Sequence, residues 1–139
     1  MTPRPPSPIL IVEDEILVAL ELEDVLAAGG YSVCAIAADR SEALQAAASC
    51  TFAFVDVNLR DGPTGPSIAR ELFERHGIHS IFVTANPGLI GAGSAGPLGY
   101  VRKPFDRLAI LAAAEWAAAP CEPPANDTVV PLGVTGANG

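Results

Sequence analysis

The sequence has little positive charge. Only 8 of its 139 residues are Lys or Arg, against 16 Asp and Glu, and the formal net charge is −8. The basic residues are scattered along the chain and form no stripe. Proteins that bind nucleic acids usually concentrate positive charge on one surface. We therefore expect no direct nucleic-acid partner.

Long apolar runs are also missing. The first apolar run, Ile9 to Val12, stops at Glu13. A signal peptide needs an apolar stretch of about 7–15 residues, and a membrane helix needs about 20. We expect no membrane association and a cytoplasmic location.

Cysteine is scarce. Cys34, Cys50 and Cys121 are odd in number and far apart, without the close pairs that a metal site or a disulfide framework would use. We expect free thiols in a reducing compartment.

The apolar residues that are present follow the pattern of an α/β protein. Short apolar runs alternate with helical periodicity, which is typical of βαβ units that build a parallel sheet with helices on both faces. The expected strands are residues 9–12, 32–37, 52–55, 80–83 and 100–101, and the expected helices are about 15–28, 40–49, 66–76 and 106–119. The predicted fold is flavodoxin-like and doubly wound, with five parallel strands in the order 2-1-3-4-5.

Two segments depart from this pattern. Residues 87–99 hold five glycines and two prolines. In a helix, each glycine costs about 1 kcal/mol and each proline about 3 kcal/mol. We expect a degraded or missing fourth helix there, in an irregular segment. Residues 120–139 are rich in Pro, Gly and Asn and are predicted to be a flexible tail without an output domain. The predicted domain is then 8–119, after an N-terminal extension over 1–7.

Polar side chains follow four of the expected strands at their carboxyl ends. These are Glu13 and Asp14 after the first strand, Asp56 after the third, Thr84 at the fourth and Lys103 after the fifth. In an open parallel sheet these ends share one edge, where the functional site lies. Two carboxylate charges 4 Å apart repel by about 4 kcal/mol at an effective dielectric near 20. A hard cation such as Mg²⁺, together with the lysine, would offset that repulsion.

This combination suits phosphoryl transfer. A carboxylate can attack phosphorus when cations neutralise the transferring group. Asp56 is the candidate nucleophile, with Thr84 as a donor to a phosphoryl oxygen and Lys103 as a fixed positive charge. The chain would then catalyse only its own phosphorylation and dephosphorylation, and would not be a conventional enzyme.

The sequence resembles the receiver domains of two-component response regulators. The motifs that carry the resemblance run in the family's order from about residue 8 to residue 119. They are Ile9-Leu10-Ile11-Val12-Glu13-Asp14-Glu15, Phe54-Val55-Asp56-Val57-Asn58-Leu59, Val83-Thr84-Ala85 and Tyr100-Val101-Arg102-Lys103-Pro104-Phe105. The implied activity is phosphorelay signalling by an aspartyl-phosphate protein, with a sensor histidine kinase or phosphotransfer protein as donor and a protein target downstream.

The resemblance also implies individual roles. Asp56 would be the phosphoacceptor, Glu13 and Asp14 would hold Mg²⁺ with Asp56, and the backbone carbonyl of Asn58 would complete the ligand set. Thr84 and Lys103 would contact the phosphoryl group. Two further implications are that Tyr100 is the switching aromatic and that Lys103–Pro104 is a cis peptide.

Three apolar residues beside the acidic pair indicate a contact surface. Ile16, Leu17 and Leu20 lie off the apolar stripe of the first helix. The helical bundle of a kinase and a second copy in a homodimer both remain open as partners.

Two other functions compete with the switch. One is a phosphorylation-independent binding module that keeps the receiver fold. The other is an aspartyl phosphatase or transferase, which would carry its nucleophile after the first strand in a D-x-D pattern, where this chain has Glu13-Asp14-Glu15.

Overall fold

The computed structural model describes residues 8–91, 96–120 and 122–132. The predicted N-terminal extension, Cys121 and the last seven residues of the predicted tail lie outside these ranges. No helix in the described parts of the chain is long and apolar enough to span a membrane.

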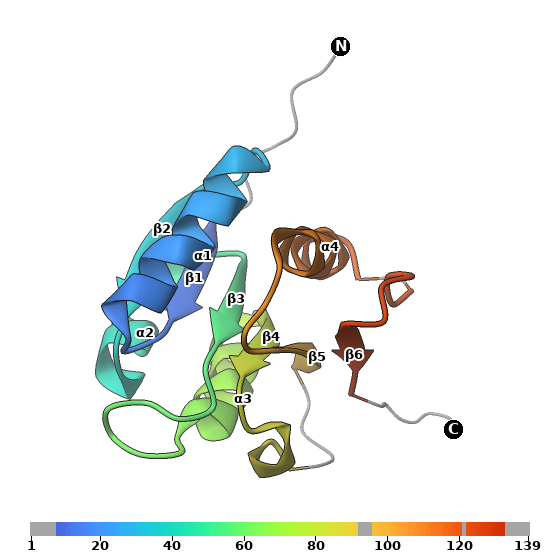
Figure 1. The fold of residues 1–139 in the computed structure, drawn as a ribbon. Helices are drawn as coiled ribbons and strands as arrows, with labels where there is room; N and C mark the ends of the chain where they lie inside the picture. The colour runs from blue at the N-terminus through green and yellow to red at the C-terminus, as the bar shows by residue number, and fades with distance from the viewer. Residues whose placement is uncertain (1–7, 92–95, 121, 133–139) are drawn as a thin grey trace.

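A twisted sheet forms the centre of the molecule (Figure 1). In the described parts of the chain it has six strands in the order β2-β1-β3-β4-β5-β6, and the first five in this order are parallel. They are β1 (Ile9–Val12), β2 (Val33–Ala37), β3 (Phe52–Val55), β4 (His79–Thr84), β5 (Pro97–Arg102) and β6 (Val129–Pro131). The flavodoxin-like class and the 2-1-3-4-5 order are confirmed, with a sixth strand added.

Helices cover both faces of the sheet (Figure 1). They are α1 (Ile16–Ala28), α2 (Arg40–Ala46), α3 (Gly65–His76) and α4 (Arg107–Ala118), with a 3₁₀ turn, η1, over Ala47–Ser49. Helices α1 and α4 pack on one face, and α2 and α3 pack on the other. Because side chains alternate along a strand, β3 sends Phe52 and Phe54 to the first face and Ala53 and Val55 to the second.

The segment between β4 and β5 has no α-helix among its described residues, in agreement with its glycine and proline content. It holds only a short 3₁₀ turn, η2, over Pro87–Leu89. Strand β5 is longer than the two residues expected, because it begins at Pro97. Its early residues pair with β4, and such tertiary pairing outweighs the poor strand propensity of glycine and proline.

Two expectations were wrong. The tail is not flexible throughout, because residues 129–131 form β6, antiparallel to the edge strand β5. Cys34 and Cys50 are not free thiols, because they form a disulfide with Cα atoms 6.3 Å apart. The fold brings the start of β2 close to the residues just before β3, a proximity that a spacing of 16 residues does not reveal.

Candidate functional site

The carboxyl ends of the strands bring three charged side chains together. Lys103 directly follows β5, and its Nζ lies 3.0 Å from Oδ2 of Asp56, which directly follows β3. The same Nζ lies 2.8 Å from Oε1 of Glu13, which directly follows β1. One ammonium group therefore pairs with carboxylates from two neighbouring strands. The Lys103–Pro104 peptide bond that follows is cis.

These groups are largely withdrawn from water. Glu13 is 2% exposed and Asp56 is 7% exposed, and the side chain of Lys103 is 15% exposed. Burial is the main cause that raises the pKa of Glu13 to about 7; the Lys103 hydrogen bond lowers it and the Asp56 charge raises it. Burial alone would lower the pKa of Lys103, but its hydrogen bonds and charge interactions with Glu13 and Asp56 outweigh burial and raise it.

A third carboxylate approaches the pair. Oxygen atoms of Glu13, Glu15 and Asp56 all lie within 4.8 Å of one another. Glu15 is exposed, its Oε2 lies 4.0 Å from Nζ of Lys103, and its backbone N–H donates to Oε2 of Glu13 at 3.1 Å. Asp14 is exposed and is not a member of this group, so the structure does not bring together all of the acids that the sequence singled out.

Sequence reasoning missed Glu15. The residue occupies the N-cap position of α1 with an extended backbone, and the sequence predicted it as the start of the helix. Its carboxylate reaches Glu13 and Asp56, whereas Asp14, at the bend between Glu13 and Glu15, is not a member of the group. The signal available in the sequence was the third acid of Glu13-Asp14-Glu15.

The loop after Asp56 turns tightly around the carboxylate. The backbone N–H of Asn58 donates to Oδ1 of Asp56 at 3.3 Å, and the N–H of Gly65 donates to the Val57 carbonyl at 3.0 Å. A Cβ atom at Gly65 would lie 2.1 Å from the carbonyl oxygen of Asp56. Glycine is therefore required where α3 starts against the site.

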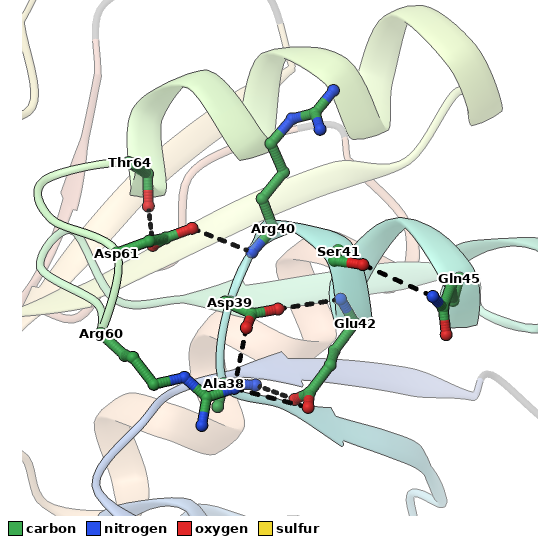
Figure 2. Close-up of polar contacts among 9 residues, drawn as sticks. All are labelled: Ala38, Asp39, Arg40, Ser41, Glu42, Gln45, Arg60, Asp61 and Thr64. Carbon is green, nitrogen blue, oxygen red and sulfur yellow. Dashed lines mark hydrogen bonds and ion pairs between the residues drawn. The ribbon is translucent and has the colours of Figure 1, made fainter.

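Polar contacts anchor the same loop to the start of α2 (Figure 2). The Arg60 guanidinium donates to Oδ2 of Asp39 at 2.8 Å. Asp61 accepts from the Thr64 hydroxyl at 2.6 Å and from the Arg40 backbone N–H at 3.4 Å. These contacts are exposed, so they define the path of the loop more than they stabilise the fold.

Among the described residues, no side-chain hydrogen bond joins Thr84 or Tyr100 to the charged side chains of the site. Thr84 is fully buried, and its Oγ1 accepts from the N–H of Asn86 at 2.9 Å. Its carbonyl accepts from the N–H of Lys103 at 2.9 Å, which ties the end of β4 to the residue after β5. Tyr100 is half-buried in β5, in register with Phe82 of β4.

An exposed apolar surface adjoins the acids. Ile16 is 60% exposed, Leu17 79% and Leu20 46%, all on the first turns of α1. The structure therefore confirms that these three side chains lie away from the core.

Comparison with known proteins decides the family. The profile of the response regulator receiver domain matches residues 9–115, which is most of the chain. The chain belongs to this family. As a receiver domain, it has the fold and the arrangement of strand-end acids and lysine described above.

The most informative relatives are regulators called PhyR. The chain is 33% identical to the phyllosphere-induced regulator PhyR of Methylorubrum extorquens over 101 residues, which is 70% of this chain and 38% of the relative. The chain thus spans well under half of that curated protein. Among solved structures, the receiver domain of Erythrobacter litoralis PhyR has a TM-score of 0.72 at 28% identity, with 81% of this chain and 90% of that chain covered.

A longer structure gives the same picture. The anti-anti-sigma factor PhyR of Bartonella quintana has a TM-score of 0.72 at 27% identity, covering 83% of this chain and 48% of that one. The similarity therefore extends over the receiver part of these regulators.

Proposed function

We propose that this receiver domain is a phosphorylation-dependent switch that takes a phosphoryl group from a histidine kinase onto Asp56. The supporting observation is the ammonium of Lys103, held 3.0 Å from Asp56 and 2.8 Å from Glu13 at the edge of the sheet. A buried lysine paired with the nucleophile provides a fixed positive charge where a phosphoryl group would arrive. The domain would signal through protein contacts.

The chemistry follows from the atoms available. A carboxylate oxygen of Asp56 attacks the phosphorus of a phosphohistidine, forming an O–P bond as the P–N bond to the imidazole breaks and its electron pair stays on the nitrogen. Lys103 then has a phosphoryl oxygen as an additional partner. The Thr84 hydroxyl, which accepts from Asn86, still has its own proton to donate to the phosphoryl group. Hydrolysis of the acyl phosphate by water would return the domain to its first state.

The acidic residues fit a Mg²⁺ ion. Three carboxylates lie around one ammonium group, so the site has excess negative charge to neutralise. Burial and the nearby Asp56 charge raise the pKa of Glu13, as expected for a carboxylate that lacks sufficient positive charge around it. Oxygen donors at this spacing are those that Mg²⁺ prefers. Glu13, Asp56 and either Glu15 or Asp14 would hold the ion, with the carbonyl of Asn58. When bound, it supplies charge neutralisation for the phosphoryl oxygens.

The partners follow from the family and from the surface. Receiver domains interact with kinases and downstream targets, and the exposed Ile16, Leu17 and Leu20 follow Glu15 at the start of α1. We assign this surface to a kinase's helical bundle, in the cytoplasm. The Bartonella relative is named an anti-anti-sigma factor, which makes a protein regulator the kind of downstream target to expect.

Phosphorylation of the intact protein tests this function. Incubation with acetyl phosphate and Mg²⁺ should add one phosphoryl group, labile in acid and base, as measured by intact mass. Asp56→Asn should abolish the addition, because the amide lacks the nucleophilic charge. Asp61→Asn, in the same loop but exposed, is the matched control and should be labelled like the parent chain. Equal labelling of Asp56→Asn would show that the phosphoacceptor is wrong, and a folded parent chain that takes no label would favour the phosphorylation-independent binding module.

Metal binding can be measured separately. Mg²⁺ titration followed by amide chemical shifts at Asp56 and Asn58 should show weak binding that Glu13→Gln reduces. Comparing Glu15→Gln with Asp14→Ala decides which acid completes the set. The observed geometry predicts the larger loss for Glu15→Gln, whereas the family resemblance predicts it for Asp14→Ala. Unchanged affinity in all three variants would contradict a metal site here.

A further inference from the structure

The disulfide between Cys34 and Cys50 lies at the end of the sheet opposite the charged site. Cys34 is the second residue of β2, and Cys50 lies just before β3 begins, whereas Asp56 follows the last residue of β3. Because β2, β1 and β3 are parallel, the bond joins the amino ends of β2 and β3. It takes no part in the phosphorylation chemistry proposed above.

A β-bulge sets Cys34 apart from the rest of β2. Ile9 of β1 lies opposite Val33, and the next residue of β1, Leu10, lies opposite Ala35. Cys34 is therefore the extra residue of β2, and a bulge of this kind re-aims a side chain. Strand β2 is also an edge strand of the sheet (Figure 1), and Cys34 is exposed. Cys34 is thus the accessible end of the disulfide.

The other end of the bond is held in place. Cys50 is half-buried, and its backbone N–H donates to the Ala47 carbonyl at 3.0 Å. Its Sγ lies 3.3 Å from the carbonyl oxygen of Ala46, the last residue of α2. In the disulfide this sulfur has no proton to donate. Once the bond opens, the Cys50 thiol has a hydrogen-bond acceptor already beside it.

The sequence around both cysteines lacks charge. Residues 25–38 and 43–55 contain no Asp, Glu, Lys or Arg, although the net charge of the chain is −8. The attacking species in thiol–disulfide exchange is a thiolate, and carboxylates next to the bond would repel it. The residues adjoining the two cysteines in sequence add no such repulsion.

We propose that Cys34 is a thiol-modification site, at which a low-molecular-weight thiol enters the Cys34–Cys50 disulfide by exchange. The thiolate attacks Sγ of Cys34 and forms a new S–S bond as the bond to Cys50 breaks. The electron pair of the broken bond stays on Sγ of Cys50, which takes a proton from water. The products are a mixed disulfide at Cys34 and a free thiol at Cys50. Attack by the Cys50 thiolate on the mixed disulfide reverses the step, and neither direction depends on phosphorylation of Asp56.

Single-cysteine variants of the full-length chain test the difference between the two sulfurs. Cys121 lies outside the described residues, so Cys121→Ser is the background for every protein. In this background Cys50→Ser leaves only Cys34, and Cys34→Ser leaves only Cys50. Glutathione disulfide is the probe, and intact mass follows the formation of the mixed disulfide. In the folded proteins Cys34 should react at least about tenfold faster than Cys50, because access to the sulfur sets the rate, and denaturing urea should remove the difference.

A second measurement keeps the disulfide intact at the start. The oxidised Cys121→Ser chain is exposed briefly to reduced glutathione, quenched in acid and treated with N-ethylmaleimide. Peptide mapping should then find glutathione on Cys34 and N-ethylmaleimide on Cys50. This measurement decides the question if the fluorescence of Trp116 shows that the single-cysteine variants are unfolded.

Three results would overturn the proposal. Glutathione found mainly on Cys50, or equal rates for the two folded single-cysteine variants, would show that Cys34 is not the preferred site. A disulfide that glutathione opens only in urea would show that the folded chain does not present the bond to thiols. A rate difference that persists in urea would place its cause in the local sequence and not in the bulge and the burial of Cys50.

Discussion

Replacing Glu13 with Gln should make the stability of the metal-free protein less dependent on pH. Glu13 is buried, and its pKa is raised from 4.5 to about 7, chiefly because burial disfavours the charged carboxylate. The folded state therefore retains a proton between these two values that the unfolded state has released. The free energy of unfolding must then fall as the pH rises from about 4.5 to about 7, and the penalty is fully present above pH 7. Glutamine keeps the shape and does not titrate.

The structure sets the size of this effect. One pKa unit corresponds to about 1.4 kcal/mol, and the exposed Glu15 beside Glu13 allows water to screen part of the shift. We expect the parent chain to lose about 1–3 kcal/mol relative to Glu13→Gln between pH 5 and pH 8. The interaction with Lys103 lowers the pKa of Glu13, so its contribution is already contained in the value of about 7. The raised pKa of Lys103 keeps the ammonium group charged over this range.

Urea denaturation in the presence of EDTA, followed by the fluorescence of the buried Trp116, measures both proteins at pH 5, 6, 7 and 8. Titratable groups far from Glu13 contribute equally in the two proteins and cancel when their free energies of unfolding are subtracted. A difference that is the same at all four pH values would refute the reasoning, because Glu13 would then titrate alike in the folded and unfolded states. Glu122→Gln, at an exposed position, is the control, and the difference in its free energy of unfolding from the parent chain should be the same at all four pH values.

Three further predictions concern the frame around the site. Gly65→Ala should destabilise the domain by about 1–3 kcal/mol in urea denaturation, because its methyl group overpacks the loop, whereas Gly88→Ala, with nothing nearby, should change stability by under about 1 kcal/mol. Reduction of the Cys34–Cys50 disulfide, which closes a separation of 16 residues, should cost about 3 kcal/mol, measured with and without dithiothreitol; equal stability would mean that the bond does not form in solution. Arg60→Ala should leave the urea midpoint nearly unchanged, since its ion pairs are exposed, and a clear fall in the midpoint would give the loop anchor a greater structural role.

Local pattern was sufficient for the framework. Apolar runs in β1, β3 and β4 are buried on both faces, so their composition alone identifies them as central parallel strands. The glycine and proline content between β4 and β5 likewise predicts the loss of a helix there. The ordering of strands then follows from the chain's family, and it brings Asp56 and Lys103 to one edge.

Features that depend on distant segments were not predictable in this way. The pairing of Cys34 with Cys50 requires the start of β2 to lie beside the residues before β3, and no local pattern encodes that distance. Strand β6 is only three residues long, too short for periodicity to reveal, and it is ordered because β5 supplies an unpaired edge and Gly99 supplies space.

The sequence by itself determined the parallel α/β sheet, the lack of an α-helix among the described residues between β4 and β5, and the identity of the acids, lysine and threonine at the strand ends. These features depend on residue type and on order along the chain. Only the tertiary structure decided which of those groups touch. It placed Lys103 between Glu13 and Asp56 and brought Glu15 to them in preference to Asp14, because the direction of each side chain depends on backbone conformation and packing at the point where its strand ends.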